Sequence, residues 1–177
     1  DANEAAEAWR LVIGLKDTPA CLVLSRQNLP TIDRMRFAPA SGLRRGAYVL
    51  ADAPDGTPQV ILIGTGSEVS LCLAAYQELA QEGITARVVS MPSWELFEQQ
   101  DQTYREHVLP PEITARVSVE AGSVIGWERY AGLGGARLGM RTFGASAPAK
   151  DLFQAFGLTP ENVVTAAKDQ IMQAKVR

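Results

Sequence analysis

The amino-acid sequence predicts a three-layer α/β/α fold built on a mixed, mostly parallel five-stranded sheet whose first strand is antiparallel. From residue 46 onward, short runs rich in Val, Ile and Leu alternate with helical patterns, which is typical of a sheet covered by helices on both faces. Asp55-Gly56 separates the first two apolar runs, so we expect a hairpin there and an antiparallel first pair. The 177 residues suffice for one such domain and a remnant of another.

The segment before the main domain predicts one helix and one strand. Residues 3–15 have apolar side chains at helical spacing, with Asp1 or Asn3 as a plausible N-cap. Residues 20–25 form an apolar run that predicts a buried strand. This run ends in a polar Ser-Arg-Gln-Asn sequence, and we therefore expect Arg26 to project from the carboxyl edge of a sheet, where α/β proteins bind ligands.

A change of composition marks a domain boundary. Residues 29–45 contain prolines, a glycine and four arginines with little periodicity, so we interpret them as a linker. Residues 1–28 are then the remnant of one domain, and residues 46–177 form a second domain. Within that domain we expect strands over 47–51, 59–65, 86–91, 115–120 and 138–143. We expect helices over 67–81, 94–99, 101–108, 127–131, 148–156 and 160–174.

Composition excludes several classes of protein. The net charge of −3 provides no broad basic surface for nucleic acid or an anionic membrane. The apolar runs are too short to span a bilayer, and the N-terminus has no features of a signal peptide. Cys21 and Cys72 lie within apolar patterns and are interpreted as small core residues with free thiols, which fits a reducing cytoplasm.

Two motifs resemble functional sites but are better explained by structure. The run from Gly64 to Ser70 follows a strand and opens a helix, where backbone N–H groups can hold phosphate. The dinucleotide fingerprint, however, needs an acid about 20 residues on, and the next strand ends in Ser90-Met91-Pro92 with no such acid. His107 is the only histidine, and without partners at ligand spacing it predicts neither a metal site nor a catalytic base.

Three further side chains are candidates for a site or an interface. Glu120 ends a strand, where a carboxylate can do acid–base work, but a structural or interface role is favoured because no second titratable group accompanies it. Trp127 lies among glycines and suits either a subunit contact or the core. Arg26 suits bidentate recognition of phosphate or carboxylate, and a salt bridge to the linker is an equal alternative.

Several ordered sequence blocks resemble the C-terminal third of the transketolase family. The blocks are Ser25-Arg26-Gln27-Asn28-Leu29-Pro30, Gly46-Ala47-Tyr48-Val49-Leu50, Thr65-Gly66-Ser67-Glu68-Val69, Arg87-Val88-Val89-Ser90-Met91-Pro92, Tyr104-Arg105-Glu106, Val119-Glu120-Ala121-Gly122 and Phe143-Gly144-Ala145-Ser146-Ala147-Pro148. By this resemblance, residues 1–28 are the end of the pyrimidine-binding domain and residues 46–177 are the C-terminal domain. Other thiamine diphosphate enzymes, such as 1-deoxyxylulose-5-phosphate synthase and the β chains of 2-oxo acid dehydrogenases, share this domain type and remain alternatives.

The resemblance implies a function for a longer protein. That protein is expected to be a cytoplasmic homodimer of the pentose phosphate pathway that transfers a two-carbon ketol unit between sugar phosphates, using thiamine diphosphate and Mg²⁺ or another divalent cation. In this chain only Arg26 is carried over, as a contact to the substrate phosphate. No catalytic residue, metal ligand or cofactor site is expected here, so the chain alone is expected to be inactive and to serve domain packing and dimerisation. A stand-alone small-molecule-binding regulatory module at Gly66-Ser67 and a purely structural dimerisation domain are the alternatives from other classes.

Overall fold

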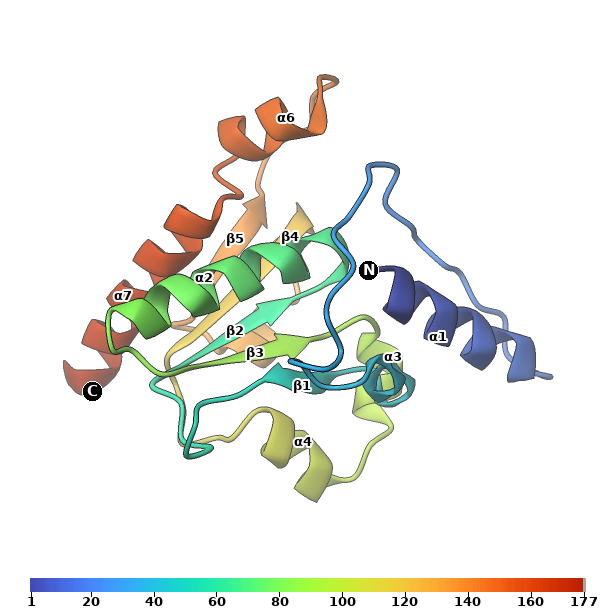
Figure 1. The fold of residues 1–177 in the computed structure, drawn as a ribbon, viewed down its shortest axis with the longest axis horizontal. Helices are drawn as coiled ribbons and strands as arrows, with labels where there is room; N and C mark the ends of the chain where they lie inside the picture. The colour runs from blue at the N-terminus through green and yellow to red at the C-terminus, as the bar shows by residue number, and fades with distance from the viewer. Residues whose placement is uncertain (177) are drawn as a thin grey trace.

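The computed structural model describes residues 1–176, which contain one five-stranded sheet between layers of helices (Figure 1). The strands are β1 (Tyr48–Ala51), β2 (Val60–Gly64), β3 (Ala86–Ser90), β4 (Arg116–Ser123) and β5 (Ala136–Met140). The α-helices are α1 (Ala2–Gly14), α2 (Val69–Gln81), α3 (Trp94–Glu98), α4 (Gln102–Val108), α5 (Glu128–Ala131), α6 (Ala149–Ala155) and α7 (Pro160–Val176). Two 3₁₀ turns, η1 (Ala40–Arg45) and η2 (Gly66–Glu68), precede β1 and α2. No helix among the described residues is long and apolar enough to cross a membrane.

The strand order is β1-β3-β2-β4-β5, and β1 alone runs antiparallel to its neighbour. The predicted class of sheet, including its antiparallel first strand, is therefore confirmed. The predicted hairpin is wrong, because β1 pairs with β3 rather than with β2. Gly56 does form a turn, with its N–H 2.9 Å from the carbonyl oxygen of Ala53. After this turn the chain forms β2 at the centre of the sheet. It then returns through helix α2 and forms β3 between β2 and β1.

Each face of the sheet has its own apolar core, as a three-layer fold requires. Alternate residues of the strands point to opposite faces, so neighbouring side chains such as Ile61 and Leu62 enter different cores. On one face the strands pack against α2 and α7, and the core residues from these helices are Val69, Cys72, Leu73, Ala75, Leu79, Val163, Val164, Ala167 and Ile171. On the other face they pack against Phe97, Val108, Leu109, Trp127 and Tyr130, from α3 to α5. Figure 1 shows α2 and α7 together over one face.

A buried arginine secures the chain segments at the amino end of β3. The Arg87 side chain is only 4% exposed and forms a bidentate pair with Asp52, with N–O distances of 2.8 and 2.7 Å. Its remaining guanidinium nitrogen donates to the carbonyl oxygen of His107 at 2.7 Å. The exposed His107 thus contributes its backbone, at the end of α4, to this arrangement.

The expected strand over residues 20–25 is not formed. These residues have no strand conformation, and Val23 is 92% exposed. An isolated strand leaves its backbone N–H and C=O groups without partners, and no strand within residues 1–176 lies beside this segment to supply them. Cys21 is exposed for the same reason, so its assignment to a core is wrong, whereas Cys72 is buried as predicted.

The last predicted strand is displaced along the sequence. We expected residues 138–143, but β5 runs from Ala136 to Met140, and Phe143 is almost fully exposed. The pairing of Val117 with Ala136 sets this boundary, because β5 needs the backbone groups of β4 along its length. Pro148 precedes α6 as its N-cap residue rather than occupying its first turn.

Candidate functional site

The carboxyl ends of β2, β3 and β4 lie at one edge of the sheet because these strands are parallel. The residues at this edge include Gly64, Ser90 and Glu120. The N-terminal end of α1 lies against the end of β3, where the Oγ of Ser90 donates a hydrogen bond of 2.6 Å to Glu4. Residues 86 positions apart in the chain therefore meet at the edge where α/β folds bind ligands.

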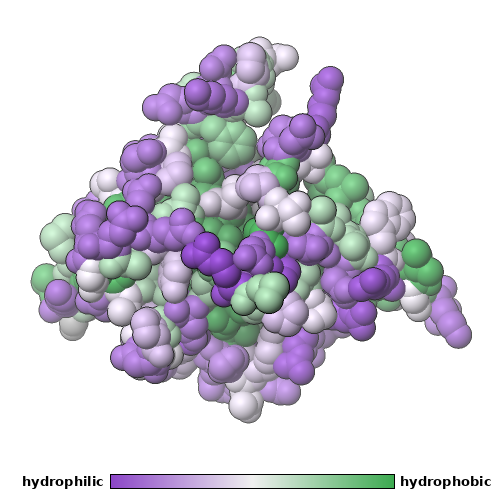
Figure 2. Space-filling view, viewed as in Figure 1, coloured by the Kyte–Doolittle hydropathy of each residue, from purple (hydrophilic) through white to green (hydrophobic). Residues whose placement is uncertain are grey.

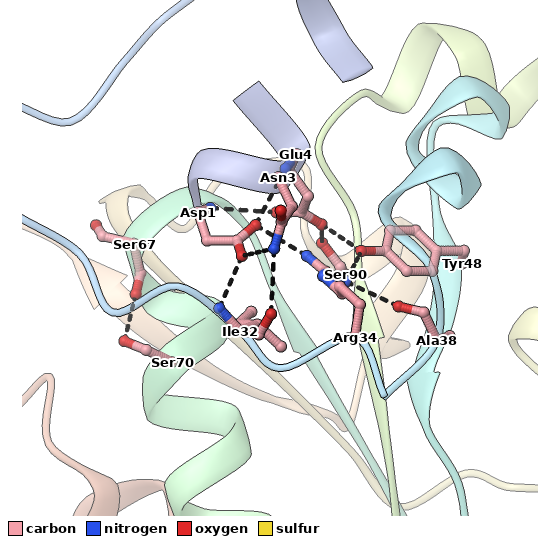
Figure 3. Close-up of polar contacts among 10 residues, drawn as sticks. All are labelled: Asp1, Asn3, Glu4, Ile32, Arg34, Ala38, Tyr48, Ser67, Ser70 and Ser90. Carbon is pink, nitrogen blue, oxygen red and sulfur yellow. Dashed lines mark hydrogen bonds and ion pairs between the residues drawn. The ribbon is translucent and has the colours of Figure 1, made fainter. Parts of the chain in front are cut away.

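Glu4 is a buried carboxylate held by two hydroxyl groups. Its Oε1 accepts hydrogen bonds from the Tyr48 hydroxyl and from Ser90 Oγ, each at 2.6 Å (Figure 3). Tyr48 and Ser90 are paired residues of β1 and β3, so their side chains lie side by side. Burial, followed by the neighbouring Glu4 carboxylate, raises the pKa of Tyr48 well above its ordinary value. Tyr48 therefore remains a hydrogen-bond donor to Glu4 at all ordinary pH values.

The first turn of α1 also binds the backbone of the linker. Asp1 caps the helix by accepting from the N–H of Glu4 at 3.1 Å, which confirms it as the N-cap. Its other carboxylate oxygen accepts from the N–H of Ile32 at 2.8 Å, and Asn3 Nδ2 donates to the carbonyl oxygen of Ile32 at 3.1 Å. Arg34 completes the arrangement by donating to Asp1 Oδ1 at 2.8 Å and to the Tyr48 hydroxyl at 2.9 Å. Figure 3 shows these contacts converging between α1 and the strands.

Helix α1 buries its acidic face and exposes its apolar face. Its two buried residues are Glu4 and Glu7, whereas Trp9 is 52% and Ile13 is 78% exposed. Burial opposes ionisation of Glu7, but hydrogen bonds from Arg10 and Arg44 outweigh it and lower its pKa. Figure 2 shows hydrophobic side chains on this outer side of the molecule, over α1 and the loop after it. The helix is thus attached to the sheet by charged groups rather than by an apolar stripe.

Two carboxylates, Glu68 and Glu120, lie near the carboxyl ends of β2 and β4. The helices that follow these two strands, α2 and α5, cover opposite faces of the sheet. Glu68 is buried, and its Oε2 accepts from the N–H of Ala121 at 3.0 Å, while Ser67 donates to its other oxygen. Burial raises the pKa of Glu68, and the nearby Glu120 carboxylate adds to this shift. Glu120 in turn accepts from Trp127 Nε1 at 2.7 Å. Glu68 therefore links η2 to strand β4, and its side chain does not cap α2.

The start of α2 offers no room for a phosphate. A cavity of only about 10 Å³ lies there, lined by Asp1, Leu29, Pro30, Ile32, Gly66, Ser67, Val69 and Ser70. This space accommodates about one water molecule. The linker residues thus fill the position that a nucleotide phosphate would take, and the alternative of a small-molecule module at Gly66-Ser67 finds no support here. Within residues 1–176, no group of three or more His, Cys, Asp or Glu side chains is arranged to hold a metal ion.

Comparisons with known proteins agree with one another. Residues 46–159 match the family model described as the transketolase-like TK C-terminal domain. The chain belongs to the transketolase family.

Individual transketolases resemble the chain over nearly its whole length. It is 52% identical to Transketolase 1 of Escherichia coli over 96% of the chain, and 46% identical to the transketolase of Geobacillus stearothermophilus over 95%. The structure of transketolase from Leishmania mexicana superimposes with a TM-score of 0.89 at 42% identity, covering 98% of this chain and 24% of that one. A Pichia stipitis transketolase in complex with sedoheptulose 7-phosphate also has a TM-score of 0.89, at 34% identity, covering 100% of this chain and 25% of that one. The chain spans about a quarter of the length of its curated relatives: it covers 25% of the Escherichia coli protein and 25% of the Geobacillus stearothermophilus protein.

In this transketolase family member the structure brings Glu120 and Trp127 together, whereas Arg26 lies on an exposed loop. Arg26 is exposed on the loop between α1 and η1, and no ion pair within residues 1–176 involves it. Glu120 and Trp127 are hydrogen-bonded to each other, with Trp127 in the core against the ring of Trp94 at 5.1 Å. Sequence reasoning missed Glu4 and Arg34, although glutamates on the inner side of a helix next to an arginine-rich linker are a signal for such a network.

We expect Tyr48→Phe to lower the free energy of unfolding by about 1.5–3 kcal/mol, because it removes a hydrogen bond to the buried Glu4 carboxylate. It should also speed amide hydrogen exchange in α1. Tyr76→Phe is the matched control: its hydroxyl donates to the neutral carbonyl of Asp52 at 2.9 Å, so it should cost only about 0.5–1.5 kcal/mol. It should not affect exchange in α1. Equal exchange of α1 in both variants would contradict an anchoring role for Tyr48.

We expect Glu68→Gln to change how stability depends on pH. The folded protein raises the pKa of Glu68, so folding favours its protonated form. The favourable contribution is present below the unfolded-state pKa and is lost as pH rises through the folded-state pKa. Glutamine does not titrate and can still accept from Ala121, so the variant should gain stability relative to the natural chain as pH rises through that window. Urea unfolding at several pH values measures this difference, and the exposed Glu106→Gln corrects for the removal of one negative charge. A difference that is constant with pH would refute the assignment.

Proposed function

We propose that this chain is the C-terminal part of an enzyme that transfers a two-carbon ketol unit between sugar phosphates. The observation that carries the proposal is the match of residues 46–159 to the transketolase C-terminal domain, together with the extended likeness to transketolases over the first 45 residues. The longer enzyme would use thiamine diphosphate and a divalent cation such as Mg²⁺. It would act as a cytoplasmic homodimer in the pentose phosphate pathway.

Within that enzyme, the contribution of this chain is substrate binding and domain packing. The described residues do not fit a site for thiamine diphosphate or its metal, because the linker fills the start of α2, Glu4 and Glu68 are bound to protein groups, and no three His, Cys, Asp or Glu side chains of residues 1–176 are grouped to hold a metal ion. We therefore assign no catalytic step to a residue of this chain. The exposed apolar face of α1 and the exposed Val23 and Leu24 suit packing against another part of the enzyme.

Arg26 is proposed to bind the phosphate group of the sugar substrates. Its guanidinium is exposed and carries a permanent charge, and it presents paired N–H donors that match phosphate oxygens. Holding the terminal phosphate would orient the reacting end of the sugar without taking part in bond making.

Replacement of Arg26 by alanine in the full-length enzyme is expected to raise the KM for phosphorylated substrates about 10- to 100-fold, the equivalent of one charge-assisted hydrogen bond. The KM for a short non-phosphorylated aldehyde such as glycolaldehyde should not change. Steady-state kinetics with both acceptors measures the effect. Lys16→Ala, which removes another exposed cation of the same loop, serves as the matched control and should leave both values unchanged. Equal losses with both acceptors would rule out a phosphate contact.

The chain alone is expected to catalyse no ketol transfer from xylulose 5-phosphate, even with added thiamine diphosphate and Mg²⁺. The physical reason is that, within residues 1–176, no three His, Cys, Asp or Glu side chains are grouped to hold the metal ion that binds the cofactor. A coupled assay on the purified chain, with the full-length enzyme as a positive control, tests this expectation. Turnover by the isolated chain would show that a catalytic site lies within these residues.

A further inference from the structure

The loop that carries Arg26 has little structure of its own. Between the end of α1 and Ile32, nearly all residues are exposed, and only Leu22 and Leu29 are half-buried. Such a loop would sample many conformations if only the chain held it. Its ends, however, are held by specific side chains. We call these side chains, Asp1, Asn3 and Arg34, the base clasp.

The base clasp closes the loop by binding both backbone groups of one residue. Asp1 accepts from the N–H of Ile32 at 2.8 Å, and Asn3 donates to its carbonyl oxygen at 3.1 Å. Ile32 is itself buried, at 8% exposure. The two ends of a segment of about 30 residues are thereby held together by hydrogen bonds to both backbone groups of Ile32.

Arg34 attaches the closed base to the body of the domain. It donates to Asp1 at 2.8 Å, to the Tyr48 hydroxyl at 2.9 Å and to the carbonyl oxygen of Ala38 at 2.9 Å. These contacts connect the first turn of α1, strand β1 and the linker through one planar guanidinium group. A planar donor with several partners fixes orientation better than a flexible ammonium would.

The segment directly after Arg26 is also in place. Leu29 and Pro30 line the small cavity at the start of α2, together with Ser67 and Val69. Only Gln27 and Asn28 separate this contact from Arg26. The position of Arg26 is therefore limited from its C-terminal side by residues of the main domain.

We propose that Asn3 and Arg34 are positioning residues for phosphate recognition by Arg26: Asn3 holds the backbone of Ile32 directly, and Arg34 holds it through Asp1. This inference rests on the proposed function, because it assumes that Arg26 binds the substrate phosphate. A guanidinium must approach phosphate oxygens within hydrogen-bond distance, and a displacement of about 1 Å is enough to cost a large part of such an interaction. The clasp touches no substrate and contributes only by holding the loop.

The test compares phosphorylated and non-phosphorylated acceptors in the full-length enzyme. We expect Asn3→Ala and Arg34→Gln each to raise the KM for a phosphorylated aldose about 10-fold, with kcat and the KM for glycolaldehyde unchanged. A loss of folded protein lowers kcat for both acceptors equally and changes neither KM, so a merely structural effect is recognised within each variant. Arg36→Gln is the matched control, because it removes an exposed arginine two residues from Arg34 whose guanidinium lies over the ring of Phe37 at 5.7 Å. It should change none of these values.

A double-mutant cycle with Arg26→Ala decides the mechanism. If the clasp acts through Arg26, the two KM effects will not multiply in the combined variant Asn3→Ala/Arg26→Ala. Effects that multiply, a change in the KM for glycolaldehyde, or the same response from Arg36→Gln would overturn the inference. If Arg26→Ala is selective for the phosphorylated acceptor and the clasp variants are not, the inference fails while the proposed function stands. If Arg26→Ala is itself not selective, both fail.

Discussion

The N-terminal segment is attached to the sheet through one buried carboxylate, that of Glu4. An ionised carboxylate removed from water is costly unless donors surround it, so Glu4 is stable in its position only where the hydroxyls of Tyr48 and Ser90 meet. That meeting point exists because Tyr48 and Ser90 are register partners in the β1–β3 pair. A hairpin of β1 with β2 would have placed Tyr48 beside another residue, and the site for Glu4 would not exist. The docking of α1 in this position therefore depends on the strand order.

The same attachment explains why the end of β3 and the start of α2 form no open ligand crevice. In open α/β sheets this edge is where ligands bind. Here α1 and the linker occupy the end of β3 and the start of α2, leaving a cavity of about 10 Å³. Nearby, Glu68 accepts a hydrogen bond from the N–H of Ala121, and Glu120 accepts one from Trp127 Nε1. This part of the edge therefore serves to attach α1 and the linker, and with them the loop that carries Arg26, to the sheet.

The elements of the main domain were predictable because their sequence patterns report burial. Strands such as β2 and β3 are buried along their whole length, and apolar runs of that kind are recognised without a structure. The turn at Gly56 was also predicted, but a turn signal does not specify which two strands pair in the sheet. The apolar run over 20–25 misled for a related reason: its pattern specifies a strand, and no strand within residues 1–176 lies beside it.

The sequence by itself determined most elements of the main domain, the three-layer class and the presence of an arginine suited to phosphate. It determined these because apolar periodicity and side-chain chemistry are local properties of the chain. Only the tertiary structure decided the strand order, the burial of Glu4 and Glu68, and the hydrogen bonds of Asn3 and Asp1 to the backbone of Ile32. Those features depend on contacts between residues 29 to 86 positions apart, and the partner of a polar side chain at such separations is set by packing and not by its neighbours in sequence.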